Sequence, residues 1–153
     1  NHLITYYGGH NLPDVRRILK YYMKTEYYMD TQQVLELANN LYYLRNYDLA
    51  RKFYEHAEEI SIGDFSPTDL AVFCNILVRA RDYERALPIC IDHEQSSGPC
   101  KGNTIATRLT IARIYKEKRN WRKVAEYSEK IIQCQPNHKI ARSYLMMATE
   151  RAN

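Results

Sequence analysis

The chain has 153 residues, enough for one domain with a buried core, and a formal net charge of +4. No apolar run approaches the roughly 18 residues needed to cross a bilayer, and no basic-then-apolar leader indicates secretion. A membrane protein is therefore not expected. The five glycines and five prolines are few, which favours helices joined by a small number of turns.

The four cysteines, at positions 74, 90, 100 and 134, are irregularly spaced and match neither a zinc site nor a dense disulfide framework. We therefore expect reduced thiols and an intracellular location, in the cytoplasm or the nucleus. The charge is uneven, because residues 101–153 hold 12 Lys/Arg and 4 Asp/Glu whereas residues 1–100 hold 10 and 14. Such an asymmetry would steer a partner of uneven charge.

Residues 1–12 contain a glycine pair and lack a helical period, so they are predicted to form an irregular lead-in. A flanking helix is predicted over 13–29. Its apolar residues surround the helix, which indicates packing on two sides, with half of an earlier repeat or with a partner chain. Tyr21 and Tyr28 are candidate surface contacts there. Because the first residue is not Met, we expect a fragment of a longer array.

Residues 31–60 predict two amphipathic helices joined by a tight turn at Arg45–Asn46. Their apolar residues recur at spacings of three and four, which places them on one face of each helix. Ala38 and Ala50 stand where the two helices must approach closely. Such a pair cannot bury both of its apolar faces alone, so similar neighbours are expected beside it.

The rest of the chain predicts further helices of the same kind. A helix is expected at 67–80, then a second one from about 83 to 92 that Pro88 should kink or shorten. A polar loop over 93–103 follows. The remaining helices are expected to begin near Thr104, to run over about 121–134 after a turn, and to end with a capping helix at 138–151.

The small residues Ala38, Cys74 and Ala112 are 36 and 38 residues apart, and Met146 lies 34 further on. Periods near 34 with two helices each are typical of tetratricopeptide repeats. The residues that carry this resemblance in the first and third units are Leu37, Ala38, Leu41, Tyr47, Ala50, Tyr54 and Ala57, then Ile111, Ala112, Tyr115, Trp121 and Pro136.

The chain therefore resembles the tetratricopeptide repeat family over residues 31–151. The resemblance implies an all-α fold, an α-solenoid of about three helical hairpins with a flanking helix at each end. The repeat domain would span 30–151, with units at about 31–64, 67–100 and 104–137 and the capping helix at 138–151.

In that family the first helix of each unit lines a concave groove that holds a partner. Asn39, Asn75 and Arg113 fall at equivalent positions and would grip the backbone of an extended peptide. The groove residues implied in this way are Gln32, Leu35, Glu36, Asn39, Tyr42, Tyr43, Thr68, Val72, Asn75, Arg79, Ala106, Thr110, Arg113 and Lys116.

Some family members bind the acidic C-termini of heat-shock chaperones with a clamp of Lys, Asn, Asn, Lys and Arg. Asn39 fits that pattern, but Leu35, Val72, Ala106 and Thr110 replace the other four residues. The resemblance therefore implies no carboxylate clamp and no chaperone-tail binding.

The basic run at 116–123 is a second candidate contact surface, with Lys118, Arg119, Arg122 and Lys123 beside Trp121. It could neutralise nucleic-acid phosphates. A solvated turn around a buried Trp, or an acidic protein partner, explains the same charges. The second unit also looks somewhat like an RNA-binding pentatricopeptide repeat.

No enzyme motif occurs. The histidines do not pair at ligand spacing, Cys100 has no recognisable catalytic base, and no GxxxxGK[ST], GxSxG or HExxH sequence is present. We therefore predict no catalytic, metal or cofactor site. The leading hypothesis is a non-catalytic scaffold that binds a protein or peptide partner. The alternative is RNA binding through the basic C-terminal third. A third reading is an internal segment of a solenoid in a larger multi-subunit complex.

Overall fold

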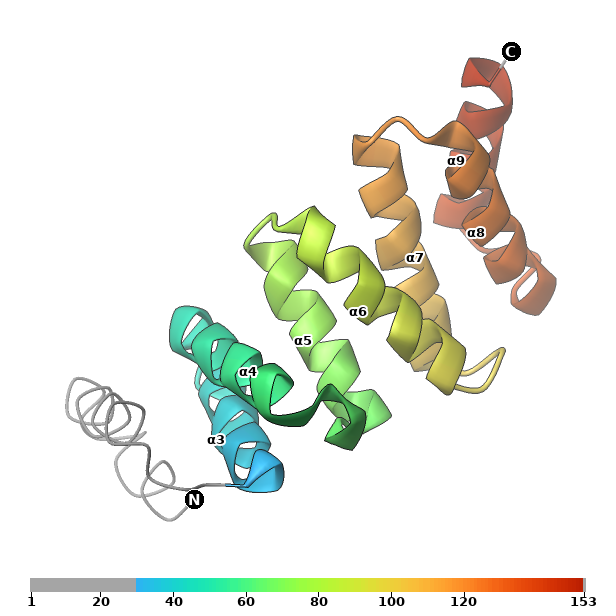
Figure 1. The fold of residues 1–153 in the computed structure, drawn as a ribbon. Coiled ribbons are helices and arrows are strands. Elements are labelled where there is room, and N and C mark those ends of the chain that lie inside the picture. Colours follow the sequence, from blue (N-terminus) through green and yellow to red (C-terminus); the bar gives the residue numbers. More distant parts are fainter. Residues whose placement is uncertain (1–29, 153) are drawn as a thin grey trace. The chain divides into compact units, whose positions relative to one another are not determined.

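The computed structural model describes residues 30–152, and their regular structure is entirely helical (Figure 1). This range contains seven α-helices, one 3-10 helix and no strand, so the all-α prediction is confirmed for it. The elements are α3 (Thr31–Tyr43), α4 (Tyr47–Ser61), η1 (Ile62–Asp64), α5 (Pro67–Arg79), α6 (Tyr83–Ser96), α7 (Gly102–Glu117), α8 (Trp121–Cys134) and α9 (Lys139–Arg151). The predicted lead-in at 1–12, the flanking helix at 13–29, Tyr21 and Tyr28 lie outside the described residues.

The chain divides into two compact units, Asn1–Ile76 and Leu77–Asn153, with the boundary inside α5. In the first unit, α3 and α4 pack against each other as predicted for residues 31–60. In the second, α7 packs on α6 and α8, and α8 packs on α9.

Three helix-to-helix turns share one backbone conformation. Arg45, Arg81 and Arg119 have φ angles of 62°, 58° and 57°, which is the left-handed region that L side chains rarely adopt. In each turn the next residue donates its backbone N–H to the carbonyl five residues earlier, the Schellman arrangement that satisfies the end of a helix. These bonds are Asn46 to Leu41 at 2.9 Å, Asp82 to Leu77 at 3.0 Å and Asn120 to Tyr115 at 2.9 Å.

The core of the first unit contains an aromatic cluster beside many buried aliphatic side chains. Tyr54 of α4 stacks on Phe73 of α5 with ring centroids 5.4 Å apart, and Phe65 lies 6.0 Å from Phe73 and 6.4 Å from Tyr54. Ala38 and Ala50 are fully buried, as expected for residues where α3 and α4 approach closely. Burial of these large rings contributes to the stability of this unit.

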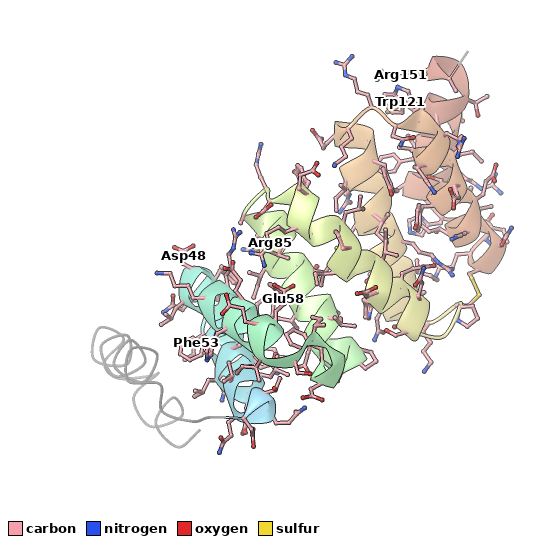
Figure 2. The ribbon with its side chains drawn as sticks, in the orientation of Figure 1. Asp48, Phe53, Glu58, Arg85, Trp121 and Arg151 are labelled. Atoms are coloured by element: carbon pink, nitrogen blue, oxygen red, sulfur yellow. A yellow bond between two sulfur atoms is a disulfide. The ribbon has the colours of Figure 1, made fainter. Side chains whose placement is uncertain are left out.

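The second unit has an aliphatic core. Ile105 of α7, Ile131 of α8 and Ala141 of α9 form one buried cluster, flanked by partly buried neighbours. A cation–π contact joins α9 to the start of α8. The Arg151 guanidinium lies 5.1 Å from the ring centroid of Trp121, the first residue of α8 (Figure 2). Trp121 is half-buried rather than fully buried.

Helix α6 is longer than predicted. It continues past Pro88 to Ser96, so the predicted end at residue 92 and the predicted loop over 93–103 are wrong. The connecting loop is 97–101, and α7 begins at Gly102. Two reasons are visible: Pro88 is on the exposed side of α6, and the turn that follows it is buried through His93 and Glu94.

A buried polar network holds the end of α6 against α7. The side chain of His93 is fully buried, with Nδ1 2.7 Å from the Thr107 hydroxyl and Nε2 3.2 Å from the Ser97 hydroxyl. Nearby, Arg108 Nε donates to Glu94 Oε1 at 2.9 Å, and both residues are buried. A buried pair of this kind is strongly destabilising to break, because the remaining charge loses its partner.

The loop 97–101 is tied down by backbone contacts and a disulfide. Arg108 Nη1 donates to the Pro99 carbonyl at 2.6 Å, and Thr104 donates to the Gly98 carbonyl at 2.5 Å. Cys100 and Cys134 form a disulfide with Cα atoms 5.4 Å apart, drawn in yellow in Figure 2. None of the four cysteines is a free thiol, so the prediction of reduced thiols is wrong.

The turn geometry predicts a stabilising substitution. Arg119→Gly should raise the free energy of unfolding by about 0.5–1 kcal/mol, because glycine adopts a positive φ without the steric cost that an L side chain meets. The measurement is urea unfolding followed by circular dichroism. The control is Glu129→Gly, at an exposed position inside α8, which should lower stability by about 1 kcal/mol. A loss of stability in Arg119→Gly would contradict the turn conformation.

The buried His93 predicts a pH dependence. Burial lowers the pKa of His93 below its ordinary value of 6.5, and the Glu94 carboxylate opposes this only partly. The unfolded chain therefore takes up a proton as the pH falls below 6.5, whereas the folded chain does so only at lower pH. Stability should consequently be fully present above pH 6.5 and decline through the window between 6.5 and the lowered pKa.

His93→Gln should make the stability curve flatter over this window than the curve of the wild type. Urea midpoints at pH 7, 6 and 5 measure the difference. Gln95→Asn, at an exposed position of α6 that carries no ionisable group, is the control and should keep the wild-type slope. An unchanged slope in His93→Gln would refute the assignment.

Candidate functional site

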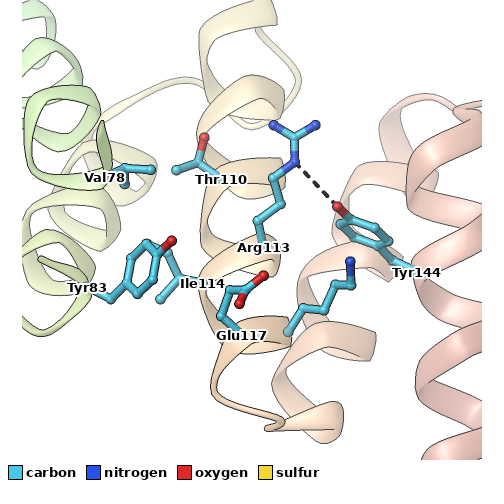
Figure 3. A pocket seen from close by; sticks show the side chains of 8 residues that line it. Val78, Tyr83, Thr110, Arg113, Ile114, Glu117 and Tyr144 are labelled. Atoms are coloured by element: carbon cyan, nitrogen blue, oxygen red, sulfur yellow. Dashed lines mark hydrogen bonds between the residues drawn. The ribbon is translucent and has the colours of Figure 1, made fainter. Parts of the chain in front are cut away.

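One face of α7 lines a pocket in the second unit. Thr110, Arg113 and Glu117 follow one another at spacings of three and four, so their side chains project from the same side of the helix. The pocket has a volume of about 220 Å³ (Figure 3). Its lining residues are Val78, Tyr83, Thr110, Arg113, Ile114, Lys116, Glu117 and Tyr144.

Tyr144 of α9 contacts both cations of the pocket. Arg113 Nε donates a hydrogen bond of 3.3 Å to the Tyr144 hydroxyl, drawn as a dashed line in Figure 3. The Lys116 ammonium lies 5.3 Å from the centroid of the same ring, a cation–π contact. The ring therefore orients two positive charges toward one side of the pocket.

Most N–H donors of the Arg113 guanidinium are not used in hydrogen bonds to the described residues. Its only hydrogen bond to other described residues uses Nε, which leaves both terminal nitrogens for a ligand. Arg113 is exposed and Lys116 half-buried, so a ligand can reach them from solvent. The opposite wall brings Val78, Ile114 and the Tyr83 ring, which provide apolar surface. The arrangement suits binding of a small group with both polar and apolar parts.

The structure brings three of the predicted groove residues, Thr110, Arg113 and Lys116, into this pocket. Arg79, at the last turn of α5, is exposed but does not line the pocket. In the first unit Asn75 is exposed, as is Tyr43, whose exposed fraction is 72%.

The tyrosines predicted for the groove form a cluster of their own. The Tyr42 ring is half-buried, with its centroid 5.6 Å from those of Tyr43 and Tyr47. Leu35 and Val72, which the family resemblance places in the groove, are buried in the core instead. Apolar side chains at these positions contribute to packing and leave the exposed surface to their polar neighbours.

Asn39 has a structural role that the sequence did not reveal. Its Nδ2 donates to Asp69 Oδ1 at 3.0 Å, and its Oδ1 accepts a hydrogen bond from the fully buried Tyr54 hydroxyl. Burial raises the pKa of Tyr54, so the phenol stays protonated and acts as the donor. Asp69 also accepts from the Ser66 backbone at 2.9 Å and so caps α5. The Asn39 amide therefore links α3, α4 and α5.

Half of the predicted basic surface is paired internally. Lys118 forms an ion pair with Glu84, and Lys123 pairs with Glu126 at 3.0 Å. Arg119 and Arg122 are exposed. Exposed pairs add little to stability, but they reduce the net charge available to a nucleic acid.

Tyr83, Glu117 and Tyr144 are site residues that the sequence analysis missed. Tyr144 lies 34 residues after Thr110, the same interval that separates Met146 from Ala112. Extending the repeat alignment by two positions would therefore have placed Tyr144 on the pocket side of its helix. Glu117 was predictable from its helical spacing to Arg113.

The Asn39 network predicts a loss of stability. Asn39→Ala should lower the free energy of unfolding by about 2–3 kcal/mol, because the buried Tyr54 hydroxyl loses its acceptor. Asn40→Ala, at the next and half-buried position, should cost less than about 0.5 kcal/mol. Adding Tyr54→Phe to Asn39→Ala should cost less than the sum of the two single changes, which a double-mutant cycle in urea measures. Additive effects would contradict the hydrogen bond.

Within residues 30–152, no group of three or more His, Cys, Asp or Glu side chains could hold a metal ion. No helix of this part of the chain is long and apolar enough to cross a membrane. Comparison of the sequence with protein-family models and with curated proteins finds no match in either set.

Proposed function

We propose that the chain is a non-catalytic interaction scaffold of the tetratricopeptide kind, an α-solenoid of three helical hairpins that binds a peptide or helix of a partner protein. The observation that carries the proposal is the pocket on α7, where three sequence-predicted groove residues, Thr110, Arg113 and Lys116, line one cavity. Its side chains present hydrogen-bond donors and apolar walls, which are the components of a recognition surface.

The turns support the count of three hairpins. The left-handed arginines are 36 and 38 residues apart, the same intervals that separate Ala38, Cys74 and Ala112. A recurring interval in two independent features, small buried residues and turn conformation, is what a repeated two-helix unit produces. On this proposal α3, α5 and α7 are the first helices of the units, and α9 is the capping helix.

The proposal has no catalytic step. It also involves no chaperone-tail clamp, because Leu35 and Val72 are buried at two of the clamp positions. An intracellular location stays a prediction, and it no longer has the support of reduced thiols, since disulfides persist mainly in oxidising compartments. Membership of a larger complex is compatible with a scaffold.

RNA binding is the second candidate. It is favoured by Arg119 and Arg122, which are exposed at the start of α8. The ion pairs of Lys118 and Lys123 count against it. Filter binding of a single-stranded RNA at low and moderate salt separates the two functions. Affinity that falls steeply with salt and requires these four residues would favour RNA over a protein partner.

The scaffold proposal is tested by filling the pocket. Peptides that bind the full chain would be selected from a random library of short displayed peptides, and their dissociation constants measured by calorimetry. Thr110→Trp should weaken these peptides at least tenfold, because the indole occupies the cavity whatever the charge of the ligand. Glu129→Trp, at an exposed position of α8 outside the pocket and outside the predicted groove, is the matched control and should leave affinity unchanged. Failure to select any peptide, or equal binding by both variants, would refute the proposal.

A further inference from the structure

We propose that the pocket on α7 binds a carboxylate of the partner, either an acidic side chain or the carboxyl group at the end of a chain. This inference rests on the proposed function, since it names the chemical group that the scaffold recognises. It uses Arg113 and Lys116, which differ from the positions of the chaperone clamp.

The Arg113 guanidinium is oriented by one hydrogen bond and keeps donors for a ligand. Its Nε is occupied by the Tyr144 hydroxyl, 3.3 Å away, and no other hydrogen bond or ion pair to the described residues involves it. The two terminal nitrogens therefore point their donors away from that bond with the plane of the group already set. Two parallel N–H donors in one plane match the two oxygens of a carboxylate.

Lys116 supplies a second positive charge beside Arg113. It is three residues after Arg113 on α7, and its ammonium lies over the Tyr144 ring, 5.3 Å from the centroid. No carboxylate among the described residues forms an ion pair with it, whereas Lys118, Lys123 and Lys130 all have such partners. A ligand carboxylate would form an ion pair with this lysine, which the Tyr144 ring already holds in place.

The charge balance of the pocket favours a carboxylate over a phosphate. The lining residues include two cations, Arg113 and Lys116, and one anion, Glu117, so their formal sum is +1. One carboxylate of charge −1 neutralises this sum. A phosphate monoester carries about −1.5 to −2 at pH 7 and would leave excess negative charge next to Glu117.

The size and the walls agree with an acidic side chain. A cavity of 150 Å³ is known to hold a benzene molecule, so about 220 Å³ accommodates a carboxylate with its methylene groups. Val78, Ile114 and the Tyr83 ring supply the apolar contact that these methylenes need. The Thr110 hydroxyl also lines the pocket, and it donates its proton to the Ala106 carbonyl at 3.1 Å.

The direct test uses three blocked amino acids as probes of the full chain. N-acetyl-glutamate methylamide offers a side-chain carboxylate, N-acetyl-glycine offers a terminal carboxylate, and N-acetyl-glutamine methylamide is the neutral match of the first. Nuclear magnetic resonance of the Arg113 Nε–H and the amides of 110–117 measures binding. We expect at least one carboxylate probe to saturate at millimolar concentration and the glutamine probe to cause no saturable shift.

Three variants define the role of charge. Arg113→Gln should weaken the carboxylate probe about tenfold, and Lys139→Gln, which removes an exposed cation outside the pocket, should have no effect. Glu117→Gln should strengthen binding by about threefold, because it removes the competing negative charge. Circular dichroism of each variant shows that the helices are intact.

The outcomes separate this inference from the scaffold proposal. Equal binding of the glutamate and glutamine probes, or loss of binding in Lys139→Gln alone, would overturn the carboxylate assignment. Tighter binding of inorganic phosphate than of either carboxylate would also overturn it. Selected peptides that are blocked by Thr110→Trp yet keep their affinity after every Asp and Glu is replaced by Asn and Gln would leave the scaffold standing without the carboxylate.

Discussion

The reversal of the chain between consecutive helices is the constraint on which the rest of the structure depends. Three residues separate α7 from α8, and the same number separates α3 from α4, so the turn must close within a single left-handed step. Arg45 and Arg119 adopt that step despite its steric cost, because the Schellman hydrogen bonds satisfy the last carbonyls of the preceding helix. Once the turn is closed, the two helices lie alongside each other and must pack, which the fully buried Ala38 and Ala50 allow for α3 and α4.

Some polar side chains are hydrogen-bonded within the fold, whereas others keep donors that a ligand can reach. The hydrogen bonds of each side chain show to which group it belongs. Asn39 is bonded on both its oxygen and its nitrogen, and Arg108 is paired with Glu94 in the core of the second unit. Replacing either residue would leave a buried group without a partner. Arg113 is different, because one hydrogen bond orients it while its terminal nitrogens stay exposed to solvent. On the proposed function, these terminal nitrogens are the groups that would contact the partner.

The sequence predicted the positions of most helices, because the apolar spacing of three and four depends only on local geometry. It failed where distant residues decide the outcome. Pro88 locally disfavours a helix, yet α6 continues because its last turn is buried. The bridge from Cys100 to Cys134 joins residues 34 apart, and irregular spacing gave no sign that the fold would bring them together. The pocket was found only in part for the same reason: Arg113 followed from the repeat alignment, whereas the tyrosine that orients it comes from α9.

Helix α7 connects the stability of the second unit with its site. Ile111 and Arg108 on one side of the helix are buried against the core, while Thr110 and Arg113 on the other side line the pocket. Because the core fixes the axial position and rotation of the helix, the lining side chains are held before any ligand arrives. A preorganised site loses less conformational entropy on binding than a mobile one, which favours recognition of a small group by few contacts. The same coupling means that damage to the buried face, for example at the Arg108–Glu94 pair, would displace the pocket residues without touching them.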